Sequence, residues 1–195
     1  MPRKNTRNTR GKIVNAAWKL FYEQGYEDTT VEDIIFESET SKGTFYHYFE
    51  GKDALLGTLS TLFDEKYEAL TQTMDKSANA IDTLAWLNRE LFAMVDNSVP
   101  MELLAGLLST QLTTRGEKHL LDRNRYYFRL LREIVMAGQE RGEIRADFSV
   151  NEITKAYAMM ERALMYDWCL CSGEYSLCKY SQTMMGMFLE GYRQK

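Results

Sequence analysis

The chain has 195 residues, of which 45% are hydrophobic and 27% charged, and its formal net charge is -4. This composition is that of an ordinary globular protein with enough residues to bury a sizeable core. No apolar run approaches the roughly 18 residues of a membrane span, and the polar N-terminus lacks the apolar segment of a secretory signal. We therefore expect a cytoplasmic protein with no membrane partner.

Helix breakers are scarce throughout the chain. Its only prolines are Pro2 and Pro100, and apolar residues recur every three or four positions almost everywhere. This pattern predicts an all-α protein of about nine helices. The cysteines are odd in number and fit no paired zinc-ligand spacing; they are Cys169, Cys171 and Cys178. We expect packed free thiols in a reducing compartment, with redox sensing as the alternative.

The first twelve residues are basic, although the chain as a whole is acidic. No acidic residue interrupts their positive charges, which belong to Arg3, Lys4, Arg7, Arg10 and Lys12. A basic arm of this kind can pair with phosphates or enter the minor groove of DNA. A helix is predicted after it, from about residue 9 to 24, with Gly25 as its natural stop.

Two short helices are predicted next, separated by a break near residues 38–40. The first opens at Thr30, whose hydroxyl can cap the helix while Asp33 completes a capping box. The second opens at Ser41 and buries only Phe45 and, one turn later, Phe49. A two-turn helix with so little apolar surface suits a groove of another molecule. This is the shape of a helix-turn-helix element, whose second helix enters the major groove of DNA.

Further positions surround these helices in a fixed pattern. The set consists of the SKGTFYHYF stretch at residues 41–49 with Ile13, Ala16, Ala17, Leu20, Phe21, Gly25, Tyr26, Thr29, Thr30, Val31, Ile34, Lys52, Leu55 and Leu56. Together they resemble the N-terminal DNA-binding module of the tetracycline-repressor (TetR) family of transcriptional regulators. The resemblance covers roughly the first quarter of the chain. It implies a helix-turn-helix domain at residues 1–52 and a helical ligand-binding and dimerisation domain at residues 53–195.

The resemblance also implies which residues contact DNA. Those facing the major groove would be Lys42, Gly43, Thr44, Tyr46 and His47, with Ser41 at the start of the helix, and those at phosphates would be Thr30, Tyr48 and Lys52. The turn departs from the family, because Ser38 and Glu39 replace a small residue and a glycine. A residue other than glycine costs on the order of 1 kcal/mol in left-handed backbone, so we expect a less tight turn.

Four longer helices are expected in the middle of the chain. The first, at about residues 52–75, would link the two domains mechanically. The other three, at about residues 80–96, from residue 100, and at 117–141, each place one amide among apolar neighbours: Asn88, Gln111 and Asn124. A buried amide without a partner costs roughly 1 to 3 kcal/mol. Each therefore needs a partner from the protein, from water or from a ligand.

Two interpretations of these amides stay open. In the first, the helical bundle itself satisfies them. In the second, which rests mostly on the resemblance, they help to line a small-molecule cavity whose residues would be Trp86, Asn88, Phe92, Leu107, Gln111, Asn124 and Tyr127.

Three arginines, Arg125, Arg129 and Arg132, fall on one stripe of the helix expected at residues 117–141. We interpret them as a solvated face that pairs with Asp122 and Glu133. An anionic-ligand clamp is the alternative.

The last two helices, the first opened by a capping box of Ser149 and Glu152, are apolar on more than one side. A helix that is apolar on two sides needs other helices packed against both sides. The simplest missing cover is a second copy of the chain, packed as a four-helix interface about a two-fold axis. The expected interface residues are Tyr157, Met160, Leu164, Trp168, Tyr180, Met184, Met187 and Phe188. A buried helix pair in a monomer is the alternative.

No catalytic or metal-binding pattern is found. His47 and His119 are the only histidines, and neither has a second ligand at metal spacing; we expect no enzyme, no cofactor and no metal site. The sequence predicts a homodimeric transcriptional repressor that binds double-stranded DNA at a palindromic operator. A small-molecule effector would release the repressor from that operator. Two alternatives stay open: a dimeric DNA-binding regulator controlled by a protein partner, and a helical binding protein whose DNA module has decayed.

Overall fold

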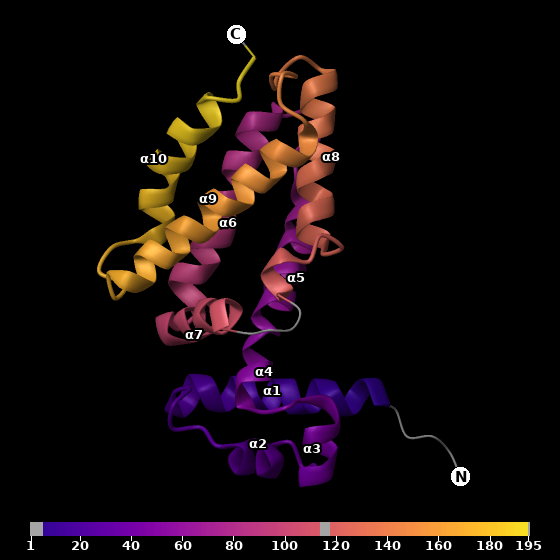
Figure 1. Cartoon of the computed structure of the whole chain (residues 1–195), viewed down its shortest axis with the longest axis vertical. Coiled ribbons are helices and arrows are strands. Elements are labelled where there is room, and N and C mark those ends of the chain that lie inside the picture. Colours follow the sequence, from indigo (N-terminus) through magenta and orange to yellow (C-terminus); the bar gives the residue numbers. More distant parts are fainter. Residues whose placement is uncertain (1–5, 114–117, 195) are drawn as a thin grey trace.

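The computed structural model describes residues 6–113 and 118–194, and within these ranges the chain is all-α, as predicted (Figure 1). The described part holds ten α-helices, one short 3-10 helix and no strand beyond a single isolated bridge between Ile144 and Arg193. The elements are α1 Thr6–Gln24, α2 Val31–Glu37, α3 Lys42–Tyr48, α4 Lys52–Leu56, α5 Leu59–Thr73, α6 Ala80–Ser98, α7 Met101–Thr113, η1 His119–Leu121, α8 Tyr126–Glu140, α9 Val150–Leu170 and α10 Leu177–Glu190.

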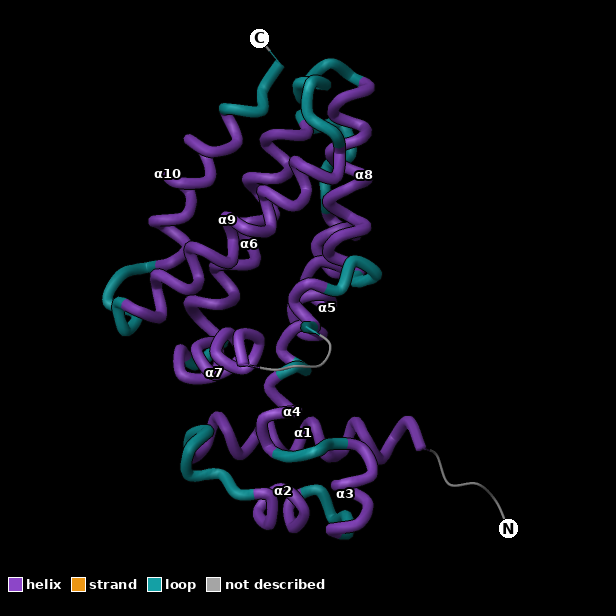
Figure 2. Tube along the Cα trace, viewed as in Figure 1, coloured by secondary structure: helices purple, strands orange, loops and turns teal. Residues whose placement is uncertain are grey.

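The helices form two groups that α4 joins. Figure 1 shows α1, α2 and α3 together at one end and the α5–α10 bundle at the other. Figure 2 shows α7 lying across the junction, just above α4, while α6, α8, α9 and α10 run along the bundle. Helix α10 packs mainly on α6, and α9 packs on α8 and α7. One continuous hydrophobic core runs through both groups, from Ile13 to Leu189.

Local side-chain caps start the two short helices, as expected. Thr30 Oγ1 accepts a hydrogen bond from the Asp33 amide at 3.1 Å, and the Asp33 carboxylate accepts one from the Thr30 amide at 2.9 Å. Ser41 Oγ accepts from the Thr44 amide at 3.1 Å. Each cap satisfies backbone donors that have no partner inside the helix. The sequence therefore determines these helix starts within a few residues.

The turn between α2 and α3 is tight, contrary to expectation. Glu39 adopts a left-handed backbone with φ 52°. The Glu39 amide bonds to the Phe36 carbonyl and the Thr40 amide bonds to the Ile35 carbonyl, both at 3.1 Å. This is the pattern of a Schellman motif. Glu39 holds the conformation that glycine would adopt more cheaply, because the two hydrogen bonds and the packing of both helices fix it.

The predicted single helix at residues 52–75 is wrong, because the chain breaks between α4 and α5. Both the amide and the hydroxyl of Thr58 bond to the Leu55 carbonyl, at 2.9 and 2.6 Å. Gly57 lies against the ring of His119, and a Cβ added at Gly57 would stand 2.8 Å from His119 Cδ2. The link between the two groups is therefore a short helix and a turn, pressed on by η1.

The predicted helix at residues 117–141 is also wrong. Helix η1 ends at Leu121, a turn follows, and α8 begins only at Tyr126. The Asp122 carboxylate accepts a hydrogen bond from the Asn124 amide at 2.9 Å, which stabilises the turn. Such a local bond from an aspartate side chain competes with helical pairing. Asn124 is consequently exposed in a turn rather than placed on a helix face.

Candidate nucleic-acid interface and interior cavity

Helix α3 presents polar residues to solvent and one aromatic residue to the core. Phe45 is fully buried, whereas Tyr46 is 48% exposed. Lys42, Gly43 and His47 are exposed as well. The partly buried members of the expected DNA set on this helix are Thr44 and Tyr48. A two-turn helix thus offers a polar surface at the end of the molecule farthest from the α5–α10 bundle (Figure 1), and such a helix fits the width of a DNA major groove.

The two lysines expected at DNA differ in their surroundings. Lys42 Nζ forms an exposed ion pair with Glu32 Oε1 at 3.0 Å. Exposed pairs are weak and screened by salt, so DNA can displace Glu32 from Lys42. Lys52 Nζ instead donates to the Tyr26 carbonyl at 2.7 Å and lies 4.3 Å from the centroid of the Tyr26 ring. Lys52 is therefore held by the segment between α1 and α2.

Part of the basic arm falls outside the described part of the chain. Arg3 and Lys4 lie outside the described residues, and the side chain of Arg7 is not described. Arg10 is described, and its guanidinium carbon lies 5.3 Å from the centroid of the Phe49 ring. That distance corresponds to a cation-π contact. The proposed role of the arm in DNA binding stays a prediction.

A buried carboxylate that the sequence analysis did not single out lies inside the α5–α10 bundle. Glu161 of α9 is 2% exposed. Its carboxylate accepts hydrogen bonds from Tyr127 Oη at 2.6 Å, from Asn88 Nδ2 at 3.0 Å and from Tyr67 Oη at 3.3 Å. Burial raises the pKa of Glu161, and burial next to this carboxylate raises the pKa of both tyrosines. The phenols therefore stay protonated and act as donors.

Glu161 had a signal in the sequence. It stands four residues after Tyr157 and three before Leu164, in the middle of an apolar row on α9. A charged residue at such a position must find polar partners when the row is buried. Since those partners come from three other helices, helical spacing alone could not name them.

A cavity of about 30 Å³ adjoins Glu161 and holds one or two water molecules at most. Polar lining comes from Tyr67, Tyr127, Arg125 and Arg162, and apolar lining from Phe63, Leu91, Leu120, Ala158 and Met165. A larger ligand would need the surrounding helices to move apart.

The cavity differs from the one predicted, since Tyr127 alone of the seven predicted residues lines it. Gln111 Oε1 accepts from the Leu120 amide at 3.2 Å, and Asn124 is exposed, so the lining role predicted for these two amides is wrong. Asn88 Nδ2 donates a hydrogen bond to Glu161, and Asn88 Oδ1 is buried without a hydrogen-bond partner among the described residues. The other predicted residues belong to the core: Phe92 and Leu107 are fully buried, and Trp86 is partly buried and packs against the hydrophobic core.

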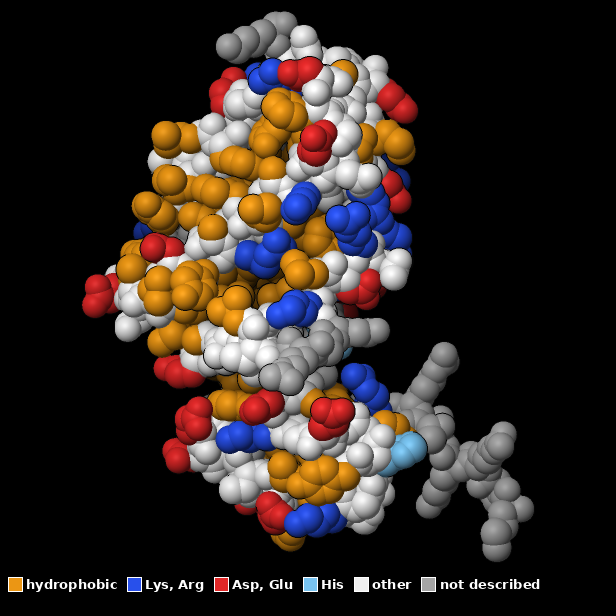
Figure 3. Space-filling model, viewed as in Figure 1, with side chains coloured by type: hydrophobic (Ala, Val, Ile, Leu, Met, Phe, Trp, Pro, Cys, Tyr) orange, Lys and Arg blue, Asp and Glu red, His pale blue; other side chains and the backbone are white. Residues whose placement is uncertain are grey.

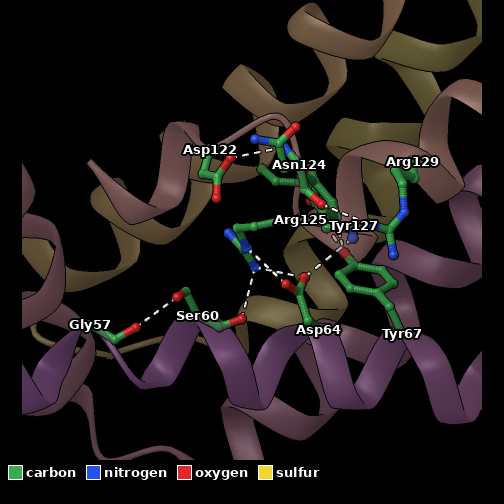
Figure 4. A network of polar contacts seen from close by, with 10 residues as sticks. Gly57, Ser60, Asp64, Tyr67, Asp122, Asn124, Arg125, Tyr127 and Arg129 are labelled. Atoms are coloured by element: carbon green, nitrogen blue, oxygen red, sulfur yellow. Dashed lines mark hydrogen bonds and ion pairs between the residues drawn. The ribbon is translucent and has the colours of Figure 1, made fainter. Parts of the chain in front are cut away.

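The arginine stripe is not a uniformly solvated face. Arg125 lies at the N-cap of α8, and its side chain is only 11% exposed. It forms a two-pronged ion pair with Asp64 of α5, at 3.0 Å from Nε and 2.9 Å from Nη2, and Nη2 also donates to the Ser60 carbonyl (Figure 4). The predicted partner Asp122 is therefore wrong for Arg125, and Arg129 donates to the Asn124 carbonyl rather than to its predicted partner Glu133. The pair ties the start of α8 to the first turns of α5, close to the break that follows α4.

Part of the predicted dimer interface is buried inside the subunit. Tyr157, Leu164 and Trp168 are at most 7% exposed, and Tyr157 Oη donates to the Leu84 carbonyl at 2.9 Å. The prediction that these three cover a second copy is wrong, because α6 and α7 already cover that row. The half-buried members of the predicted set are Met160, Met184 and Phe188, and the exposed members are Tyr180 at 45% and Met187 at 71%.

A neighbouring apolar row on α9 is exposed instead. Met159 is 52% exposed, Tyr166 47% and Leu170 67%. With the exposed face of α10 they form a hydrophobic surface, and Figure 3 shows hydrophobic side chains gathered over this side of the bundle. Contiguous exposed apolar surface of this kind marks an interaction site.

The chain matches known proteins along its length. The family model for bacterial regulatory proteins of the tetR family matches residues 13–59. An uncharacterized HTH-type transcriptional regulator, YxaF of Bacillus subtilis, is 30% identical over 147 residues, which is 70% of this chain and 77% of YxaF. The chain belongs to the TetR family. It is therefore a DNA-binding transcriptional regulator rather than an enzyme.

Two further regulators and one solved TetR-family structure are also similar to this chain. A regulator from the lacX 3' region of Lactococcus lactis is 48% identical over 48 residues, or 25% of this chain and 24% of that protein. The fatty acid metabolism regulator protein of Bacillus subtilis is 22% identical over 94% of this chain and 95% of its own. In structure, Thermus thermophilus FadR in complex with lauroyl-CoA matches with a TM-score of 0.77 at 22% identity, over 92% of each chain.

The remaining sequence predictions concern thiols, metals and membranes. The cysteines are free, and burial raises the pKa of the Cys169 thiol to about 11, so it stays protonated. Within the described residues, no group of three or more metal-ligating side chains comes together. None of the described helices is by itself long and apolar enough to span a bilayer; α6 and α7, which meet at a bend of 116°, would reach that length and composition only together.

Proposed function

We propose that this TetR-family protein is a homodimeric repressor of a palindromic operator and that binding of a small molecule to the α5–α10 bundle releases it. The domain division at residues 1–52 and 53–195 belongs to this proposal. The observation that carries it is the exposed polar face of α3 in a chain that also exposes an apolar face on α9 and α10. A two-fold pair joined through that face would present two reading helices about one DNA turn, or roughly 34 to 36 Å, apart.

The proposed coupling between effector and DNA runs through the junction at α4. A Cβ added at Gly106 of α7 would stand 3.1 Å from Leu56 Cδ1, and η1 presses on Gly57. Opening the cavity beside Glu161 would move α8 and, through the Arg125–Asp64 pair, the start of α5. An effector shifts DNA affinity only in proportion to its different affinity for the two arrangements.

The effector that we propose is an amphipathic molecule with an apolar portion. Support comes from the Thermus FadR complex with lauroyl-CoA and from the relative named a fatty acid metabolism regulator. The apolar side chains beside the cavity, such as Phe63, Leu91 and Met165, suit a hydrocarbon group once the helices part.

The small size of the cavity favours a second candidate function. A dimeric DNA-binding regulator controlled by a protein partner would need no interior space beyond the present 30 Å³. A thermal-shift titration with lauroyl-CoA separates the two. A rise in melting temperature that depends on concentration supports the effector, and an unchanged melting temperature supports the protein partner.

DNA binding is tested by a gel shift against the region upstream of the gene, with random DNA for comparison. Tyr46→Ala should weaken binding to the specific site more than binding to random DNA, since Tyr46 is proposed to lie in the groove. Lys52→Ala, at a residue proposed to contact a phosphate, should weaken both and flatten the dependence on salt. Equal losses on both DNAs for Tyr46→Ala would defeat the groove assignment.

A further inference from the structure

A hollow of about 170 Å³ lies between η1 and α8 on one side and α9 on the other. Four of its lining residues are cationic: Arg123, Arg132, Lys155 and Arg162. We refer to it as the basic groove. No acidic residue lines it, and Figure 3 shows Lys and Arg side chains gathered on this side of the bundle. Such an excess is unexpected in a chain with a net charge of -4.

The cations of the basic groove differ from the other arginines of the bundle in lacking acidic partners. Arg125 pairs with Asp64, Arg141 with Glu143, and Arg145 with Asp147. By contrast, none of the four groove cations forms an ion pair with an acidic residue of the described ranges. Like charges gathered in a concave site repel one another and attract an anion strongly.

A buried hydroxyl provides a second, independent observation. Thr154 lines the basic groove, is 3% exposed, and its Oγ1 is buried without a hydrogen-bond partner. Buried polar atoms in folded proteins nearly always have a hydrogen-bond partner, so the unpaired Thr154 hydroxyl in this charged hollow indicates a ligand that supplies one. A hydroxyl can donate to an anionic oxygen, as the surrounding guanidinium groups can.

The basic groove also meets the interior cavity. Ala158 and Arg162 line both hollows, so the basic groove and the space beside Glu161 are neighbours. On the groove side Leu121 and Phe128 add apolar surface next to the charges. A cationic hollow therefore lies directly beside one that is mainly apolar.

We propose that the basic groove binds a ligand group bearing two or more phosphates and that this group is the head of the effector whose apolar part enters the cavity. The inference rests on the proposed regulation by a small molecule and adds the chemistry of its polar end. Two phosphates match four cations in charge more nearly than one carboxylate does. Arginine also binds phosphate oxygens in pairs, and Arg132 is held toward the groove by its bond to the Arg123 carbonyl at 3.2 Å.

The test uses the full chain and three probes, lauroyl-CoA, coenzyme A and inorganic pyrophosphate, in isothermal titration calorimetry. Wild type should bind lauroyl-CoA and, more weakly, coenzyme A, with affinities that fall as salt rises. Arg162→Gln should weaken binding of both by about tenfold, as expected for losing one charge-assisted hydrogen bond, and Lys155→Glu, which reverses a charge, should weaken it further. Pyrophosphate binding as tight as that of coenzyme A would assign the site to free diphosphate rather than to a nucleotide head.

Lys76→Glu is the matched control, because Lys76 is exposed in the α5–α6 loop and does not line the groove. It should bind all three probes like wild type. If Lys155→Glu and Lys76→Glu bind lauroyl-CoA equally while the ligand still releases DNA, the groove assignment is overturned and the proposed function stands. If wild type binds none of the probes, the assignment is overturned too, whereas loss of DNA binding by wild type in the gel shift would overturn the proposed function itself.

Discussion

The polar contacts inside the α1–α3 group differ from those inside the α5–α10 bundle in how far apart the joined residues lie in the sequence. Around α2 and α3 the caps join residues three apart, Thr30 with Asp33 and Ser41 with Thr44. In the bundle, Glu161 meets Tyr67 across 94 positions and Asn88 across 73. Local caps form wherever the segment folds, whereas long-range contacts exist only in one packing of the helices. Neighbouring residues thus specify much of the first group, whereas the second depends on how its helices pack.

The largest expected effect comes from removing the buried carboxylate. Glu161→Ala leaves the donors of Tyr67, Tyr127 and Asn88 without partners and opens a void, so the free energy of unfolding should fall by about 3 kcal/mol or more. Urea denaturation followed by circular dichroism measures this. Glu161→Gln keeps the volume and one acceptor and should lose clearly less; an equal loss for both variants would contradict the role of the hydrogen bonds.

Wild type and Glu161→Gln should also differ in how their stability depends on pH. Burial raises the folded-state pKa of Glu161 above its ordinary value of 4.5, so the folded protein binds a proton that the unfolded chain releases. The stability that this proton contributes is complete below pH 4.5 and is lost as pH rises through the folded pKa. Glu161→Gln has no such loss. Its stability relative to wild type should therefore improve as pH rises above 4.5, and a pH-independent difference would contradict this.

A smaller loss is expected at the junction of the two groups. Arg125→Met removes the paired contact with Asp64 and should lower the free energy of unfolding by about 2 kcal/mol, because the contact is largely buried. Release of DNA by the effector should weaken as well, since α8 would no longer pull on α5. Arg129→Met is the control: Arg129 is exposed, donates to the Asn124 carbonyl and lies over the Tyr126 ring, without an ion pair in the described residues. Equal behaviour of both variants would argue against the proposed coupling.

A local cap should have a modest and confined effect. Ser41→Ala removes the hydrogen bond to the Thr44 amide, which should cost about 1 kcal/mol and loosen the first turn of α3. DNA affinity should fall in a gel shift while effector binding by calorimetry stays unchanged. Ser176→Ala, which removes a cap of α10, should leave DNA affinity alone. A change in effector binding for Ser41→Ala would mean that the two groups are less independent than their contacts indicate.

The smallest expected effect is a gain. Glu39→Gly replaces a residue that holds φ 52° with the residue that adopts this backbone most cheaply, so stability should rise by about 0.5 kcal/mol. Glu23→Gly, in the regular helix α1, should instead be destabilising. Thermal denaturation of both variants checks the sign. A loss for Glu39→Gly would show that its side chain contributes more than its backbone costs.

The sequence by itself determined the all-α class, the capped helices α2 and α3 and the exposed polar face of Lys42, Tyr46 and His47. Those features depend on helical periodicity and on contacts three or four residues apart, which can be read along the chain. Lys52 shows the limit even there, since its partner Tyr26 is 26 positions away.

Only the tertiary structure decided the break after α4, the partners of Arg125, the buried role of Glu161 and which row of α9 is exposed. Helix α9 is apolar on two rows, and its spacing alone cannot tell that Tyr157, Leu164 and Trp168 turn inward while Met159 and Tyr166 stay outside. That choice depends on how α6 and α7 pack against it, and packing sums contacts between residues far apart in the sequence. The physical reason is the distance along the sequence over which each interaction acts. Local hydrogen bonds depend on neighbouring residues, whereas burial depends on residues that are far apart in the sequence.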